Sequence, residues 1–368
     1  MPSLFDPIDL GAVRAPNRVL MAPLTRGRAT REHVPTAIMG DYYAQRAGAG
    51  LIITEATGIS REGLGWAYAP GLWTDAQTEG WKPVVEQVHR AGGRIFAQLW
   101  HMGRLVHPDF LDGAAPLSSS ATQAPGAVRT YLSLEESEKA KRGYGMARAA
   151  TLDDIARVLD DYARAARNAR AAGFDGVQLH AANGYLIDQF LRDGANLRDD
   201  DYGGSPENRA RLLREAVARL IDAVGADRVA VRFSPNGDTQ GVIDSDPESV
   251  FVPAAKWLDD QGIAFLELRE VGQEGTFGST DQPKVGPAIR RVFTRPLILN
   301  QDYRGDNAQA ALDAGLADGI AFGRPFISNP DLVDRLRTGA ALTPDVVAHW
   351  YSRGTEGYTD YPVLAEAA

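Results

Sequence analysis

A single (β/α)8 barrel is the fold that the sequence predicts, and three observations support it. Eight short β-branched or aliphatic runs recur along the 368 residues, and helical patterns follow them. Each run is nearly continuous in apolar residues, as expected of strands that are buried on both faces. No linker or shift in composition divides the chain, although its length alone would allow roughly two or three domains. We therefore expect one α/β domain over residues 1–368, a TIM barrel with a loop insertion after its third strand.

The candidate strands are short apolar runs that end in polar or turn residues. In chain order they cover residues 19–22, 51–54, 95–99, 176–180, 229–233, 265–268, 296–299 and 319–322. In barrels of this kind the chemistry takes place at the carboxyl ends of the strands. Functional residues are therefore expected at those eight ends.

The helices between the strands have clear start and stop signals. Thr151 can cap the helix after the third strand, and Gly173 supplies a left-handed residue at its end. The next helix is expected to begin at Ser205-Pro206 and to end at Gly225. Both have an apolar stripe at helical spacing, which we expect to face the sheet.

Residues 107–150, between the third strand and its helix, form one irregular interval. They are rich in Gly, Pro, Ser and charged residues and show little periodicity. Long loops in compact domains are usually functional, so this segment is a candidate lid over the mouth of the barrel. A surface excursion without function is the alternative. The three consecutive aspartates at 199–201 are expected to form a solvated loop, because no companion metal ligands flank them.

Composition excludes several classes of function. The chain has no cysteine, which rules out disulfides, thiol nucleophiles, Cys-ligated zinc and iron–sulfur clusters. With 39 basic and 48 acidic side chains its net charge is −9, so we expect no nucleic-acid partner and no membrane surface as a partner. No export signal is visible at the start, and no apolar run approaches the ~18 residues of a membrane span. These features predict a cytoplasmic protein that acts on small molecules.

The strand ends exclude two common barrel chemistries and leave a third open. A Schiff-base aldolase requires a lysine at a strand end, and no predicted strand end has one. The six histidines show no metal-binding spacing. We therefore expect no metal site. Glu55 and Glu267 could form a carboxylate pair, so a glycoside hydrolase remains an alternative.

The last two strand ends favour a bound phosphate. No GxGxxG fingerprint occurs, so a Rossmann site for a resident dinucleotide is not expected. The chain instead has Asn300-Gln301 and Gly323-Arg324 where many barrels bind a phosphate, and Arg232 adds positive charge near a phosphate or an electron-rich ring. Two further strand-end groups can hold a heterocycle such as an isoalloxazine: Thr25 and Gln98.

Several sequence blocks stand at predicted strand ends and loops, and together they extend over almost the whole chain. They are Leu4-Phe5, Asn17-Arg18, MAPLTR at 21–26, QLWHMGR at 98–104, HAANGYL at 180–186, DYGGSPENR at 201–209, AFGRP at 321–325, NPDL at 329–332 and GYTDYP at 357–362. With these blocks the chain resembles the Old Yellow Enzyme family of FMN-dependent ene reductases. The resemblance implies a barrel that binds FMN tightly without a covalent bond and takes electrons from NADPH or NADH.

The same resemblance implies three catalytic residues. His180 and Asn183 look like the family's pair of donors to the carbonyl or nitro oxygen of the substrate, which draws electron density from the alkene. Tyr185 is similar to the family's proton donor, which acts on the α-carbon after hydride from flavin N5 has reached the β-carbon. Its unperturbed pKa of about 10 keeps the phenol protonated at neutral pH, as an acid requires.

The cofactor site is implied by the resemblance as well. Thr25 looks like the residue that bonds flavin O4, while Gln98 and Arg232 resemble the groups at the pyrimidine edge and N1. Pro23, Leu24 and Ala56 resemble ring contacts. The remaining cofactor residues are those of the two last strand ends: Asn300, Gln301, Gly323 and Arg324.

The chain departs from the family pattern at two places. Relatives often carry a Gly-rich turn after the seventh strand, whereas this chain has Asn300-Gln301-Asp302-Tyr303. Trp66 stands where many relatives have tyrosine. Together with Thr25, four aromatic residues are expected to make a narrow pocket that favours stacking: Trp66, Tyr68, Trp100 and Tyr351.

These expectations lead to one function and two alternatives. The function is ping-pong reduction of electron-poor alkenes such as enones, enals, maleimides and nitroalkenes by a monomer or homodimer. A glycoside hydrolase that uses Glu55 and Glu267 is the first alternative, and a non-catalytic flavin-binding protein is the second.

Overall fold

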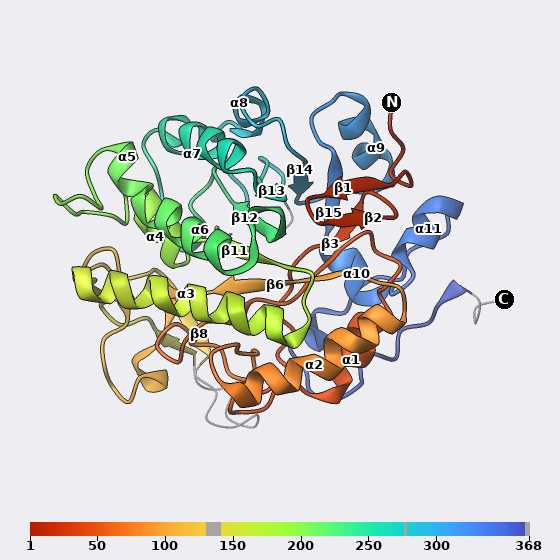
Figure 1. Ribbon diagram of the computed structural model, residues 1–368, viewed down its shortest axis with the longest axis horizontal. Coiled ribbons are helices and arrows are strands. Elements are labelled where there is room, and N and C mark those ends of the chain that lie inside the picture. The colour runs from red at the N-terminus through yellow and green to blue at the C-terminus, as the bar shows by residue number, and fades with distance from the viewer. Residues whose placement is uncertain (130–140, 276–277, 365–368) are drawn as a thin grey trace.

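The computed structural model describes residues 1–129, 141–275 and 278–364 and contains a closed parallel β-barrel (Figure 1). Its eight strands follow one another in chain order, and β11 pairs with β6 to close the ring. The strands are β3 (Val19–Met21), β4 (Ile52–Ile53), β6 (Ile95–Trp100), β11 (Gly176–Ala181), β12 (Val229–Phe233), β13 (Phe265–Arg269), β14 (Leu297–Asn300) and β15 (Gly319–Phe322). The predicted (β/α)8 fold is confirmed, and every predicted strand overlaps an observed one.

The second barrel strand differs from its prediction. It is split into β4 and β5 (Thr57–Gly58), and both parts pair with β6. Glu55 lies in the break, where its carboxylate accepts the backbone N–H groups of Arg26 at 3.1 Å and Gly27 at 3.0 Å. The strand is interrupted where this side chain satisfies donors from the loop after β3, and a prediction from local pattern could not show this.

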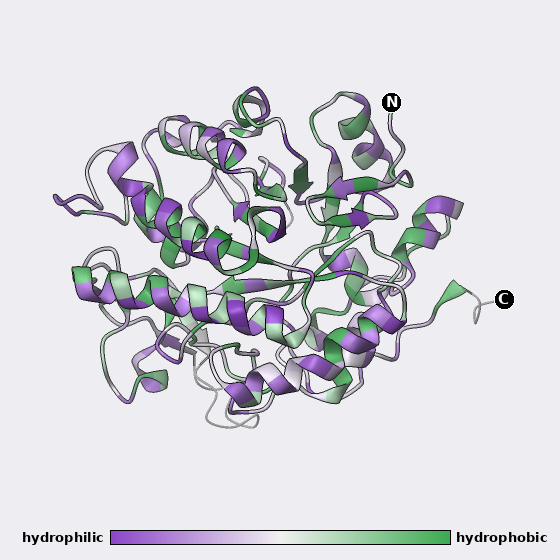
Figure 2. Ribbon diagram, viewed as in Figure 1, coloured by the Kyte–Doolittle hydropathy of each residue, from purple (hydrophilic) through white to green (hydrophobic). Residues whose placement is uncertain are grey.

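Helices surround the strands on the outside (Figure 1). In Figure 2 hydrophilic and hydrophobic bands alternate along α3, as expected of a helix with one apolar face against the barrel. The helices are α1 (Ala37–Ala44), α2 (Asp75–Arg90), α3 (Leu152–Ala172), α4 (Leu186–Leu191), α5 (Pro206–Arg209), α6 (Arg211–Val224), α7 (Pro247–Gln261), α8 (Gly286–Arg290), α9 (Gly305–Asp313), α10 (Arg324–Ser328) and α11 (Leu332–Thr338).

The predicted helix signals hold for α3 and fail in part for the next helix. The Thr151 hydroxyl accepts the backbone N–H of Asp154 at 3.1 Å, and Gly173 ends α3 with a φ of 97°. The helix expected from Ser205 to Gly225 is two helices, α5 and α6. Ala210 has a ψ of −2°, far from the helical value of about −42°, and turns the chain between them.

An N-terminal hairpin closes one end of the barrel. Strands β1 (Ile8–Leu10) and β2 (Val13–Ala15) pair antiparallel, and their apolar side chains pack with inward residues of the barrel strands. The barrel side of this cluster includes Leu20, Ile53, Phe96, Phe265 and Ile298. Because this end is sealed by an apolar layer, a ligand has access from the carboxyl ends of the strands.

The insertion after β6 carries short strands of its own. Strand β7 (Leu117–Ser118) pairs parallel with β10 (Arg148–Ala149), and β8 (Ala127–Arg129) pairs antiparallel with β9 (Lys141–Gly143). The Ser119 hydroxyl donates to the backbone oxygen of Gln189 at 2.8 Å, which ties the insertion to α4. Residues 130–140 of the predicted lid lie outside the described residues, and the role of 107–150 as a lid stays a prediction.

No helix within residues 1–129, 141–275 and 278–364 is long and apolar enough to cross a membrane. Over those same residues no three His, Asp or Glu side chains gather into a group that could hold a metal ion.

Candidate active site

A cavity of about 640 Å³ opens at the carboxyl ends of the barrel strands. Its wall is formed by the segments that follow β3, β11, β13, β14 and β15, together with residues near the C-terminus. It includes Asn183, Tyr185, Arg232 and Arg269, and Trp350 and Tyr351 come from the C-terminal part. Its volume lies within the range of roughly 300–1,000 Å³ that small-molecule and cofactor sites occupy.

A chain of buried polar side chains crosses the barrel interior beneath this cavity. Every second residue of a barrel strand faces inward, which brings together Gln98 of β6, Gln178 of β11 and Glu267 of β13. Gln98 Nε2 donates to Gln178 Oε1 at 2.8 Å, and Gln178 Nε2 donates to Glu267 Oε2 at 2.7 Å. Arg232 Nε lies 3.3 Å from Glu267 Oε1, and Arg232 Nη2 donates to Asn300 Oδ1 at 2.7 Å. The cation on the cavity floor is therefore held by a buried carboxylate and an amide.

The two candidate glycosidase carboxylates do not face the cavity. Glu55 is buried and accepts the backbone N–H groups of the loop after β3, and burial raises the pKa of its carboxyl group. Glu267 is buried behind Arg232 as its counter-ion. Neither residue lines the cavity, so the geometry gives no support to a glycoside hydrolase.

His180 at the end of β11 lies in an aromatic cluster with Tyr185 and Trp100. The Tyr185 ring meets both others edge to face, with centroids 4.9 Å from each. His180 Nδ1 is buried and has no hydrogen-bond partner in the part of the chain that the structure describes. Burial, with the positive charges of Arg232 and Arg269, holds the pKa of His180 well below its usual value. The imidazole is therefore neutral at neutral pH.

Tyr185 lines the cavity and is the N-cap residue of α4. Burial raises the pKa of its phenol above the usual value of about 10. The phenol is therefore protonated throughout the physiological range, in the state that a general acid needs.

A tight turn positions Asn183 and Tyr185 between β11 and α4. Asn183 and Gly184 both have a positive φ, of 59° and 78°. A Cβ on Gly184 would lie 2.7 Å from the backbone oxygen of Thr239, so glycine is required there. Asn183 lines the cavity, and its backbone N–H donates to Ser234 Oγ at 2.7 Å.

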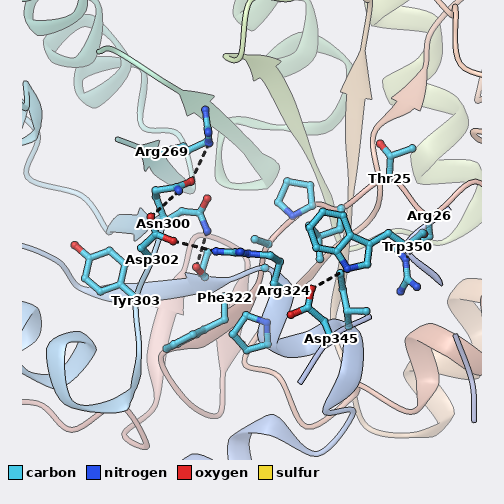
Figure 3. A pocket seen from close by; sticks show the side chains of 18 of the residues that line it. Thr25, Arg26, Arg269, Asn300, Asp302, Tyr303, Phe322, Arg324, Asp345 and Trp350 are labelled. Carbon is cyan, nitrogen blue, oxygen red and sulfur yellow. Dashed lines mark hydrogen bonds and ion pairs between the residues drawn. The ribbon is translucent and has the colours of Figure 1, made fainter. Parts of the chain in front are cut away.

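The turn after β14 contains two non-glycine residues with a strained backbone. Gln301 has a φ of 95° and Asp302 a φ of 58°, a region that costs a non-glycine residue about 1–3 kcal/mol. Side-chain contacts hold this turn: Arg269 Nε donates to Gln301 Oε1 at 3.1 Å, and Arg324 Nη2 lies 3.0 Å from Asp302 Oδ1. Figure 3 shows Arg269, Asp302 and Arg324 along one side of the cavity.

Most of the predicted cofactor residues lie in the cavity wall. They are Pro23, Leu24, Thr25, Arg232, Asn300, Gln301, Gly323 and Arg324. Ala56 and Gln98 are buried and do not line the cavity. The flavin contacts of all ten predicted cofactor residues stay predictions.

The predicted aromatic mouth is only partly assembled. Trp66 and Tyr351 line the cavity with ring centroids 5.3 Å apart. Trp100 is buried against Tyr185, beside the cavity rather than in its wall. Tyr68 does not line the cavity, and the centroid of its ring lies 3.3 Å from the guanidinium carbon of Arg353.

Sequence reasoning gave no role to Arg269, which the structure places beside Asn183. The signal for it was its inward register on β13, two residues after Glu267. Arg269 lines the cavity and is buried, and its Nη1 donates to Asn183 Oδ1 at 2.9 Å.

Comparison with known proteins identifies the class of this barrel. The model of the NADH:flavin oxidoreductase / NADH oxidase family matches residues 3–343. The structure of the old yellow enzyme homologue from Zymomonas mobilis is 61% identical and superimposes with a TM-score of 0.95, covering 99% of this chain and all of that one. Morphinone reductase in complex with tetrahydroNAD is 44% identical with a TM-score of 0.92, over 99% of this chain and 98% of that one. Chanoclavine-I aldehyde reductase of Penicillium roqueforti is 41% identical over 376 residues, covering this whole chain and 98% of that protein.

The barrel and its cavity thus define an oxidoreductase, and the chain belongs to the NADH:flavin oxidoreductase / NADH oxidase family. It is an NAD(P)H-dependent flavin enzyme, and the resemblance to the Old Yellow Enzyme family that its motifs indicate is confirmed.

Proposed function

We propose that this enzyme is an FMN-dependent ene reductase that reduces enones, enals, maleimides and nitroalkenes with electrons from NADPH or NADH. One observation carries the proposal. The neutral imidazole of His180 packs against the protonated phenol of Tyr185, and Tyr185 lines the same cavity as the Asn183 amide and the Arg232 cation. A cytoplasmic location and a monomeric or dimeric state stay predictions.

The residues present fit a flavin mononucleotide. Arg232 offers positive charge at the cavity floor for the electron-rich N1 edge, and Thr25 offers a hydroxyl across the cavity (Figure 3). Gly323 and Arg324 line the cavity where β15 ends, which is where barrels commonly bind a phosphate. When bound, FMN supplies the hydride that the alkene accepts.

His180 and Asn183 bind and polarise the substrate. The buried Nδ1 of His180 has no partner among the described residues, as expected of a group that a ligand satisfies. A neutral imidazole donates one N–H, and an amide donates two. Two such donors on a carbonyl or nitro oxygen stabilise the charge that develops there during reduction, and they do so without reorganisation.

Tyr185 holds the proton that completes the reduction. Its phenol borders the cavity and stays protonated, so it can deliver that proton to the α-carbon of the alkene. The same cavity serves the nicotinamide and the alkene in turn, which accounts for ping-pong order without a second nucleotide-binding fold.

Flavin content tests the proposal. Protein purified with added FMN should be yellow, with close to one FMN per chain by absorbance after denaturation. Protein that shows no flavin absorbance after this treatment would refute the proposal. A flavin-binding protein without catalysis would also be yellow but would not turn over NADPH with cyclohexenone.

A further inference from the structure

The Asn183 side chain is held by an arginine that lies 86 residues further along the sequence. Arg269 Nη1 donates to Asn183 Oδ1 at 2.9 Å, and both residues line the cavity. The two residues come from opposite sides of β12, Asn183 after β11 and Arg269 at the end of β13. This contact determines whether the oxygen or the nitrogen of the amide points into the cavity.

The direction of the amide follows from hydrogen-bond chemistry. A guanidinium has five N–H donors and no acceptor, so the atom of Asn183 that faces Arg269 is the oxygen. The Nδ2 group is then the end of the amide that faces away from Arg269. If the amide were turned over, its N–H groups would face the N–H groups of Arg269. A ligand oxygen in the cavity would then face Asn183 Oδ1.

Arg269 is itself fixed by its surroundings. Its Nε donates to Gln301 Oε1 at 3.1 Å, and its Nη1 lies 3.4 Å from Thr239 Oγ1. Gln301 Nε2 donates to Asp302 Oδ2 at 2.8 Å, and Asp302 pairs with Arg324. The strained turn after β14 therefore supports Arg269 from one side, as Figure 3 shows.

Arg269 also keeps its charge. Burial and the nearby Arg232 lower its pKa to about 10, which still leaves the guanidinium protonated at neutral pH. It therefore acts as a donor at neutral pH.

We propose that Arg269 is a positioning residue that turns the Asn183 amide so that its N–H group, and not its oxygen, faces the substrate. The inference rests on the proposed function, because it assumes that a substrate oxygen binds at Asn183. Arg269 acts through Asn183. The proposal requires no direct contact between Arg269 and the substrate.

A double-mutant cycle tests this dependence. The probe is 4-hydroxybenzaldehyde, whose phenolate oxygen should bind at His180 and Asn183 and shift the absorbance of the oxidised flavin-loaded protein. Its Kd is measured for wild type, R269L, N183A and R269L/N183A. The conservative R269K, which keeps a cationic donor of similar reach, is the matched control.

The expected pattern is specific. R269L and N183A should each weaken phenol binding about tenfold, the loss of one hydrogen bond to a charged oxygen. The double variant should bind as N183A does, because Arg269 has no route to the ligand without the amide. R269K should bind nearly as wild type. Flavin content and the urea midpoint of unfolding are measured for every variant, and R269M, which keeps the length of the stem, replaces R269L if the latter loses flavin.

Two results would overturn the inference. Additive losses in the double variant would mean that Arg269 contacts the ligand directly, and wild-type affinity in R269L would mean that Asn183 needs no such support. Failure of the proposed function looks different: the wild-type protein itself would lack flavin, or its flavin would not be reoxidised by an enone.

Discussion

The rings of His180 and Tyr185 meet edge to face, with centroids 4.9 Å apart and planes inclined at 80°. Burial moves their pKa values in opposite directions, down for the imidazole and up for the phenol. Both side chains are therefore uncharged at neutral pH. A hydrogen-bond donor and a proton source thus stand side by side in a site that already contains the charges of Arg232 and Arg269.

Replacement of Tyr185 by phenylalanine should separate the two half-reactions. Y185F removes the proton but keeps the ring packed against His180 and Trp100, so flavin reduction by NADPH should proceed at nearly the wild-type rate. Reoxidation by 2-cyclohexenone should slow by roughly a hundredfold, the usual contribution of a general acid. Anaerobic stopped-flow absorbance measures both rates. Unchanged reoxidation would show that solvent or another group supplies the proton.

Removal of both oxygen-binding donors should impair substrate binding more than flavin binding. In H180A/N183A, 4-hydroxybenzaldehyde affinity and enone reduction should each fall by roughly a hundredfold, because each of the two lost hydrogen bonds to a charged oxygen contributes about tenfold. The ratio of FMN to protein should stay near that of wild type. If the variant lost its flavin to the same extent as its ligand affinity, these side chains would have to be assigned to the cofactor.

Gly184 is expected to be irreplaceable for two separable reasons. G184A combines a positive φ of 78° with a Cβ only 2.7 Å from a backbone oxygen, whereas Gly204 has a φ of 75° and open space around it. G204A should cost about 1 kcal/mol of unfolding free energy from backbone strain alone. G184A should cost more and should also weaken phenol binding, because the turn carries Asn183 and Tyr185. Urea unfolding of both variants checks this, and equal costs would argue against the close contact.

Acid should destabilise the fold through His101. Its Nδ1 accepts the Gly103 N–H at 3.1 Å, its Nε2 has no partner among the described residues, and burial lowers its pKa to about 4. Below pH 6.5 the unfolded chain binds a proton that the folded chain does not bind until about pH 4. The unfolding free energy therefore falls as the pH falls through this window, by up to roughly 3 kcal/mol from this residue.

The variant H101N isolates that contribution. An asparagine oxygen can accept the Gly103 N–H in place of Nδ1 but does not titrate. Urea unfolding at pH 7.5 and pH 4.5 should show a smaller loss of stability in H101N than in wild type. An identical loss in both proteins would place the acid sensitivity elsewhere.

Barrel strands and strand-end residues could be predicted because they depend on local pattern. Apolar runs identify buried strands, and the alternation of inward residues carries Gln98, His180, Arg232 and Asn300 to one end of the barrel. Partners that are distant in the sequence could not be predicted in this way. Glu55 looked like a catalytic carboxylate, but its partners are backbone groups of Arg26 and Gly27.

Two other features of the site could not be predicted, for the same physical reason. Tyr68 was expected in the substrate pocket, yet its ring packs against the guanidinium of Arg353, far along the chain, and does not line the cavity. The contact between Arg269 and Asn183 depends on the closing of the barrel and on the strained turn at Gln301. Neither local propensity nor a family motif contains that information.

The central claim is that this barrel passes electrons from a nicotinamide to an alkene, and an anaerobic titration tests it most directly. Flavin absorbance of the purified, FMN-loaded protein is followed while NADPH is added to completion and 2-cyclohexenone is then added without oxygen. We predict that the flavin band bleaches with NADPH and returns in full with the enone, with cyclohexanone formed in equal amount. A band that bleaches but does not return with any enone or nitroalkene would contradict the claim.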